Sequence, residues 1–156
     1  MAPNRAPYEA VDVAKWFINA TDREAGDDVT HLKVQKLLYY AQGWALVFFD
    51  APLFDEKLEA WAHGPVAPNV WEKFKEFGWS SIGPQKITRK ITGDHARLLS
   101  AVQERYGIYS AKKLEGMTHS EPPWIKARGG LPPNARCNTP LSVAGMKIYF
   151  SSLKPE

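Results

Sequence analysis

The segment from Thr30 to Asp50 constrains the fold more than any other part of the chain. It reads THLKVQKLLYYAQGWALVFFD, and apolar residues recur along it at the spacing of a helical face. These residues are Leu37, Ala41, Trp44, Ala45 and Phe48, and Leu38, Tyr40 and Phe49 widen the stripe. A helix that is apolar over so much of its circumference is usually the central, most buried one. Gly43 lies inside this helix. Glycine in a helix interior is less favourable than alanine by about 1 kcal/mol of helix stability, so its presence here predicts close contact with a neighbouring helix.

Shorter helices are predicted on both sides of this segment. Apolar periodicity and capping residues indicate helices over 10–20, 69–77, 92–106, 111–117, 121–128 and 140–153. Asn69 and Glu72 resemble a capping box at the start of the second of these helices. Its expected buried residues are Val70, Phe74 and Phe77, and those of the last helix, opened by Thr139 and Pro140, are Val143, Met146, Phe150 and Leu153.

A different pattern separates the long helix from the helix at 69–77. Leu58, Ala60 and Ala62 alternate with polar or aromatic residues, which is the period of a strand. Gly64 and Pro65 are expected to end this short extended element. The prediction is therefore a mainly α fold, a compact helical domain of about five to seven helices with a short extended or β element after the second helix.

Length and composition indicate one domain over residues 1–156, with its core at about 8–153. The chain has 156 residues, of which 44% are hydrophobic and 12% aromatic, enough for a core. A single cysteine, Cys137, excludes a disulfide within the chain. We find no signal peptide, and the longest apolar run, Ala45 to Phe49, is too short to span a bilayer. A cytoplasmic location without membrane contact is therefore expected.

The sequence contains no recognisable constellation of catalytic residues. The four histidines have no metal-ligand spacing with each other or with Cys137, and no phosphate-binding or nucleophile motif is present. His63 is a candidate general base, because strand alternation would place it on the same side as Glu59 and Trp61. Cys137 is a candidate nucleophile beside Arg136. Neither has an identifiable partner, so we predict no catalytic, cofactor or metal site and no enzyme; a small enzyme using His63 or Cys137 is the least favoured alternative.

Basic residues raise a second alternative, a nucleic-acid-binding repressor. They are the stretch KITRK at 86–90, Arg97, and Lys112 with Lys113. The net charge is only +3, and no DNA- or RNA-binding motif accompanies these residues. Direct DNA binding is therefore not expected.

Tryptophans favour a protein-binding role instead. Six occur in 156 residues, and only Trp44 lies on the central apolar stripe. Partly exposed tryptophans are typical of protein interfaces, although they also cover the edges of small cores. The candidate protein-binding residues are Trp61, His63, Trp71, Trp79 and Trp124.

Four blocks follow one another along the chain and together carry a family resemblance. They are K-x-x-K-L-L-Y-Y-A from Lys33 to Ala41, then PLF with E-A-W-x-x-G-P-V ending at Val66, then LEGMTHSEPPWIKAR, and finally TPLS…YF. With these blocks the chain resembles the Panacea-domain family of SocA-like antitoxins, from about Val11 to Leu153.

This resemblance implies a function and partners, but no catalytic residues. Panacea-domain proteins neutralise a cognate toxin by direct protein contact, and their toxins are diverse. The partner implied here is therefore a toxin protein, SocB-like or other. A SocA-like member is also a proteolytic adaptor that delivers its toxin to the protease ClpXP.

Overall fold

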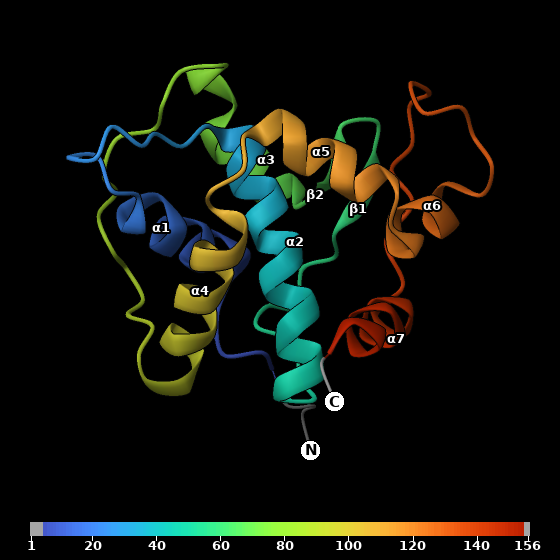
Figure 1. The fold of residues 1–156 in the computed structure, drawn as a ribbon, viewed down its shortest axis with the longest axis horizontal. Coiled ribbons are helices and arrows are strands. Elements are labelled where there is room, and N and C mark those ends of the chain that lie inside the picture. Colours follow the sequence, from blue (N-terminus) through green and yellow to red (C-terminus); the bar gives the residue numbers. More distant parts are fainter. Residues whose placement is uncertain (1–4, 155–156) are drawn as a thin grey trace.

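The computed structural model describes residues 5–154, and in them the chain is mainly helical (Figure 1). The seven α-helices are α1 (Ala10–Ala20), α2 (His31–Phe48), α3 (Pro68–Phe74), α4 (Gly93–Tyr106), α5 (Ala111–His119), α6 (Pro122–Arg128) and α7 (Val143–Leu153). A 3-10 turn, η1 (Lys75–Phe77), follows α3. Strands β1 (Glu59–Trp61) and β2 (Gly64–Val66) form an antiparallel hairpin after α2. This arrangement confirms the predicted fold class.

Helix α2 runs through the middle of the molecule, as predicted. Every residue from Val34 to Leu46 is buried, and the helix packs against α1, α4, α5, α7 and the hairpin (Figure 1). The prediction was wrong for Phe48, which is 53% exposed. It lies in the last turn, where its ring stacks on the outer side of Trp44, whose own side chain is buried.

Gly43 confirms the predicted close approach of another helix. A Cβ atom at this position would lie only 2.2 Å from the ring of Phe150, which comes from α7. The Phe150 ring therefore occupies the space that a side chain on α2 would need. Its ring also meets the ring of Tyr39 edge-on, with the two centroids 5.4 Å apart.

Two buried glutamines on α2 hold both ends of the segment that carries the hairpin. The Nε2 of Gln42 donates to the carbonyl of Phe54 at 2.7 Å, and its Oε1 accepts from the Leu53 amide at 2.8 Å. About two turns earlier on the same helix, the Oε1 of Gln35 accepts from the amide of Ala67 at 2.7 Å. These amide side chains satisfy backbone groups that burial would otherwise leave unpaired, so they fix the segment to the central helix.

The hairpin extends the predicted extended element. Glu59 pairs with Val66 and Trp61 with Gly64, so the Gly64–Pro65 pair belongs to the second strand and does not end the element. A φ of 109° at Gly64 suits glycine and allows the tight reversal. The other edge of β1 is also paired, because the Ala60 amide donates to the carbonyl of Thr139 at 2.9 Å.

Two helix starts differ from the prediction. Helix α3 begins at Pro68 with Ala67 at its N-cap, because proline favours the first helical turn; Asn69 therefore makes no cap. Helix α7 begins at Val143, capped by the side chain of Ser142, because the preceding residues 139–141 pair with β1 and its flank.

Some predicted buried residues at the helix ends are exposed. Val70, Phe74, Met146 and Phe150 are buried as expected. Phe77, Val143 and Leu153 lie at element ends beyond the packed faces, and each is more than one-third exposed. None of the helices within residues 5–154 is long and apolar enough to cross a membrane.

Candidate protein-binding site

Four of the five predicted binding residues gather around the hairpin. We call Trp61, His63, Trp71 and Trp79 the hairpin face. Trp61 contacts Trp71 edge-on, with ring centroids 5.5 Å apart, and Trp61 and His63 line one surface hollow. His63 and Trp79 line a second, smaller cavity. These shared contacts make the hairpin face a continuous surface, although its residues come from β1, the hairpin turn, α3 and the segment after η1.

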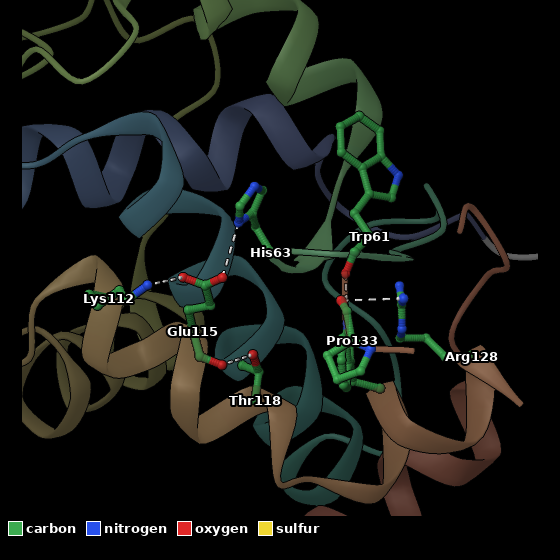
Figure 2. Close-up of polar contacts among 8 residues, drawn as sticks. Trp61, His63, Lys112, Glu115, Thr118, Arg128 and Pro133 are labelled. Atoms are coloured by element: carbon green, nitrogen blue, oxygen red, sulfur yellow. Dashed lines mark hydrogen bonds and ion pairs between the residues drawn. The ribbon is translucent and has the colours of Figure 1, made fainter. Parts of the chain in front are cut away.

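Trp61 is held by polar and aromatic neighbours. Its Nε1 donates to Glu59 Oε1 at 2.8 Å, so alternation along β1 does place these two side chains on one side. Figure 2 shows the indole pointing toward α3, where Trp71 lies. The Lys75 ammonium also lies 5.1 Å from the centre of the Trp71 ring. The pair is half-buried, so each ring keeps an accessible edge on a fixed support.

His63 belongs to the turn and not to the strand, which corrects the predicted alternation. Its Nδ1 is 3.0 Å from Glu115 Oε1 on α5 (Figure 2). The histidine side chain is 69% exposed, whereas that of Glu115 is 20% exposed. The pair positions the turn beside α5. Because its histidine is largely open to water, the pair contributes little to stability.

Trp124 differs from the other tryptophans because it is buried. It is only 5% exposed, and its Nε1 donates to the carbonyl of Trp61 at 2.8 Å. Its ring stacks on His119 with centroids 4.1 Å apart. The prediction that it contributes to a partner surface therefore does not fit its position: Trp124 supports the hairpin from beneath.

Arg128 is a supporting residue that the sequence did not reveal. Its guanidinium donates to the carbonyls of Ala60 at 2.9 Å, Pro132 at 2.6 Å and Ala135 at 2.7 Å, and it also lies over the Trp124 ring. It thereby ties the hairpin to the loop after α6 (Figure 2). An arginine at the end of a short helix carries no pattern that distinguishes this role from an exposed one.

Lys36 is the second residue that sequence reasoning missed. Its side chain is 1% exposed beneath the hairpin, and a Cβ at Gly64 would be 2.6 Å from its Cε. Burial lowers the pKa of Lys36 to about 8, against the opposing attraction of Glu115. The sequence feature that could have identified Lys36 is its position as a lysine inside an otherwise apolar helix, within the K-x-x-K-L-L-Y-Y-A block.

A buried carboxyl joins α2 to α6. Tyr39 and Tyr40 each donate a hydroxyl hydrogen bond of 2.9 Å to Glu121, one to each carboxyl oxygen. Burial raises the pKa of Glu121, although these hydrogen bonds oppose the shift. The Y-Y pair and the EPPW block thus meet in the core, where their role is architectural.

The two residues considered for catalysis line the same hollow but are not connected. His63 and Cys137 border a cavity of about 660 Å³ with Glu59, Trp61, Ala62, Arg136 and Asn138. The imidazole of His63 bonds to Glu115 instead. For Cys137, burial favours a higher pKa, but hydrogen bonding to Thr139 and the charge of Arg128 outweigh it, so its pKa is lowered. Within residues 5–154 no group of histidine, cysteine and acidic side chains could hold a metal ion.

The basic residues do not assemble into one face. Arg97 on α4 pairs with Asp94, and Lys112 on α5 lies 4.0 Å from Glu115. These basic residues come from three segments of the chain: the loop before α4, α4 itself and the start of α5. This dispersed arrangement does not offer a stripe of cations for a nucleic-acid backbone.

The structure thus defines a class of protein: a mainly helical one in which partly exposed aromatic residues surround a rigidly supported hairpin. Comparison with known proteins then gives the family. The family model "Antitoxin SocA-like, Panacea domain" matches residues 34–125, which include the hairpin face and Lys36. The Antitoxin SocA of Caulobacter vibrioides (strain NA1000 / CB15N) is 31% identical over 139 residues, covering 80% of this chain and 74% of that protein. The chain belongs to the SocA-like Panacea-domain antitoxin family. No solved structure matches it significantly.

Proposed function

We propose that this protein is an antitoxin that neutralises a cognate toxin by binding it directly through the hairpin face. Family membership carries the antitoxin assignment. The structure supports the choice of surface, because the hairpin face has exposed or half-buried tryptophans, among them Trp79 at 81% exposure. Tryptophan is enriched among the residues that dominate binding energy at protein interfaces. In this proposal the protein acts by binding and not by catalysis, and it works in the cytoplasm.

The rigid support of the hairpin favours binding by a preformed surface. Gln35, Arg128 and Trp124 all hydrogen-bond to the backbone of the hairpin or its flank. A surface that is already ordered loses less conformational entropy when a partner binds. The partly exposed rings therefore need little rearrangement to contact a toxin.

Co-expression tests the antitoxin proposal. A toxin gene encoded beside this one should arrest growth alone, and growth should recover when this protein is co-expressed and co-purifies with the product. Substituting Trp61 or Trp79 by alanine should weaken toxin binding roughly thirtyfold, a loss of about 2 kcal/mol. Ile148→Ala is the matched control, because Ile148 is 72% exposed on α7, away from the hairpin face. A harmless neighbour, or one that does not bind, would contradict the antitoxin proposal.

The adaptor role is the finer part of the proposal. An adaptor needs one surface for its cargo and a second for the protease, and the second can be small because tethering raises the effective concentration of the cargo. The toxin should then be degraded faster by purified ClpXP when this protein is present. An unchanged toxin half-life, with toxin neutralisation intact, would mean that the protein only masks its toxin.

A further inference from the structure

A small cavity opens beside the hairpin face, and a buried lysine lies at its inner end. It has a volume of about 110 Å³ and is lined by Leu32, Lys36, His63, Trp79, Ala111, Lys112 and Glu115. Three of these residues, His63, Trp79 and Lys112, are exposed and border its mouth. Lys36 is almost fully buried. Small-molecule sites are commonly about 300–1,000 Å³, so this cavity suits one side chain better than a cofactor.

The ammonium of Lys36 has no hydrogen-bond partner within residues 5–154. The nearby polar groups bond to other partners, because Thr118 Oγ1 donates to the Glu115 carbonyl at 2.8 Å and Glu115 Oε1 bonds to His63 (Figure 2); neither makes a hydrogen bond with the ammonium. A buried charge without a partner is costly and normally acquires one. An anionic group entering the cavity would give the Lys36 ammonium a hydrogen-bond and charge partner.

The surrounding charges favour such an anion. Lys36, Lys112 and His63 contribute basic groups to the lining, and Glu115 is its only acidic residue among those described. His31 and His119 also lie close enough for the charge of Lys36 to lower their pKa values, in addition to the larger effect of burial. Burial lowers the pKa of Lys36 only to about 8, so this amine remains mostly protonated at neutral pH.

We propose that this cavity receives the carboxylate of an aspartate or glutamate side chain from the bound partner protein, which pairs with Lys36. This inference rests on the proposed function and adds the chemistry of the contact: an acidic side chain enters beside Trp79 while the tryptophans of the hairpin face cover its surroundings. A singly charged, planar carboxylate fits the narrow volume and meets less repulsion from Glu115 than a phosphate does.

Acetate tests the site without any partner. In NMR spectra of protein labelled with ¹³C-lysine, the Cε resonance of Lys36 is assigned as the one that is absent from the spectrum of Lys36→Met. Sodium acetate should shift this resonance saturably, whereas acetamide, which is neutral and of the same shape, and sodium chloride at equal ionic strength should not. Equal responses to acetate and acetamide, no saturable response, or tighter binding of inorganic phosphate would overturn the proposal.

Toxin binding tests the same site in its proposed setting. Lys36→Met should weaken toxin binding at least tenfold. The matched control is Lys113→Met, because Lys113 is exposed on the same helix as Glu115 but does not line the cavity. If folded Lys36→Met binds the toxin as tightly as the wild type, only this inference fails. If the wild type does not bind the toxin at all, the proposed function fails, and the acetate experiment still decides whether the carboxylate site exists.

Discussion

At the scale of single residues, Gly43 sets how closely α2 and α7 approach. The Phe150 ring occupies the space beside it, with a ring carbon 2.2 Å from where a Cβ would be. Alanine at position 43 would gain about 1 kcal/mol of helix propensity, but the buried ring has little room to move. We expect Gly43→Ala to lower the free energy of unfolding by about 1–3 kcal/mol, the usual cost of overpacking.

Urea denaturation of this variant beside Gly116→Ala checks the prediction. Gly116 lies inside α5 with open space where its Cβ would be. That substitution should therefore stabilise the protein by up to about 1 kcal/mol. If both variants were equally stabilised, the conclusion that Phe150 leaves no room for a side chain at position 43 would be wrong.

Lys36 predicts an unusual dependence of stability on pH. Its pKa is about 8 in the folded protein and near its ordinary value of 10.5 when unfolded. Below pH 8 both states are protonated, and the folded state bears the full cost of the buried charge. Between pH 8 and 10.5 the unfolded chain binds more protons, so the free energy of unfolding rises with pH. We expect a gain of about 2 kcal/mol between pH 7 and pH 9.5.

Lys36→Met isolates this contribution, because other lysines and tyrosines also titrate at high pH. The variant should be more stable than the wild type at pH 7, and the difference should shrink toward pH 9.5. Chemical denaturation at both pH values measures it. A difference that stayed constant with pH would contradict the assignment of a lowered pKa to Lys36.

The sequence predicted the exposed residues around the hairpin better than the buried ones beneath it. Trp61, Trp71 and Trp79 were selected because they lie off the apolar stripes, and the structure leaves all three at least partly exposed. Trp124 satisfied the same criterion but is buried, because its indole N–H finds the carbonyl of Trp61 across 63 positions in the chain. Such a contact depends on tertiary packing, which helical periodicity does not encode.

At the scale of elements, the hairpin depends on the loop that follows α6. Residues 139–141 pair with β1 and its flank, and Arg128 holds carbonyls of both the hairpin and the loop. Arg128→Met should leave the buried carbonyl of Ala60 and the partly buried carbonyls of the loop without this donor, and lower the free energy of unfolding by about 3 kcal/mol. It should also expose the chain between Gly129 and Thr139 to limited proteolysis.

Lys126 provides the matched control for this substitution, because it is a cationic residue on the same helix and its side chain is exposed. Lys126→Met should leave both stability and the cleavage pattern unchanged. If Arg128→Met resisted protease as well as this control, the arginine would not be what orders the loop.

The helices were more predictable than the strands. Ser110 and Gly129 act as the helix start and stop that their residue types indicate, because their capping geometry is local. The second strand was missed because Gly64–Pro65 usually signals a break. Here Pro65 lies opposite Ala60, whose amide donates to Thr139 instead of across the hairpin. The third segment of this small sheet comes from the other end of the chain, beyond the reach of any local pattern.

At the scale of the whole molecule, toxin binding should stabilise the antitoxin. A partner that binds only the folded state adds about 2.7 kcal/mol when its free concentration is one hundred times Kd. We expect thermal unfolding of the protein to move upward as purified toxin is added, and the shift to be smaller for Trp79→Ala. An equal shift for this variant and the wild type would exclude Trp79 from the contact.

The pairing of Ala60 with Thr139 also has a consequence for synthesis on the ribosome. The hairpin emerges early, but its third segment and Arg128 follow only after most of the chain has been translated. About 75 residues separate the end of β2 from Leu141, which corresponds to roughly 4–15 seconds of elongation at typical rates. A truncated nascent chain would therefore display the tryptophans without their support. The toxin binding that we propose would then become possible only after these late segments have been made, near the end of translation.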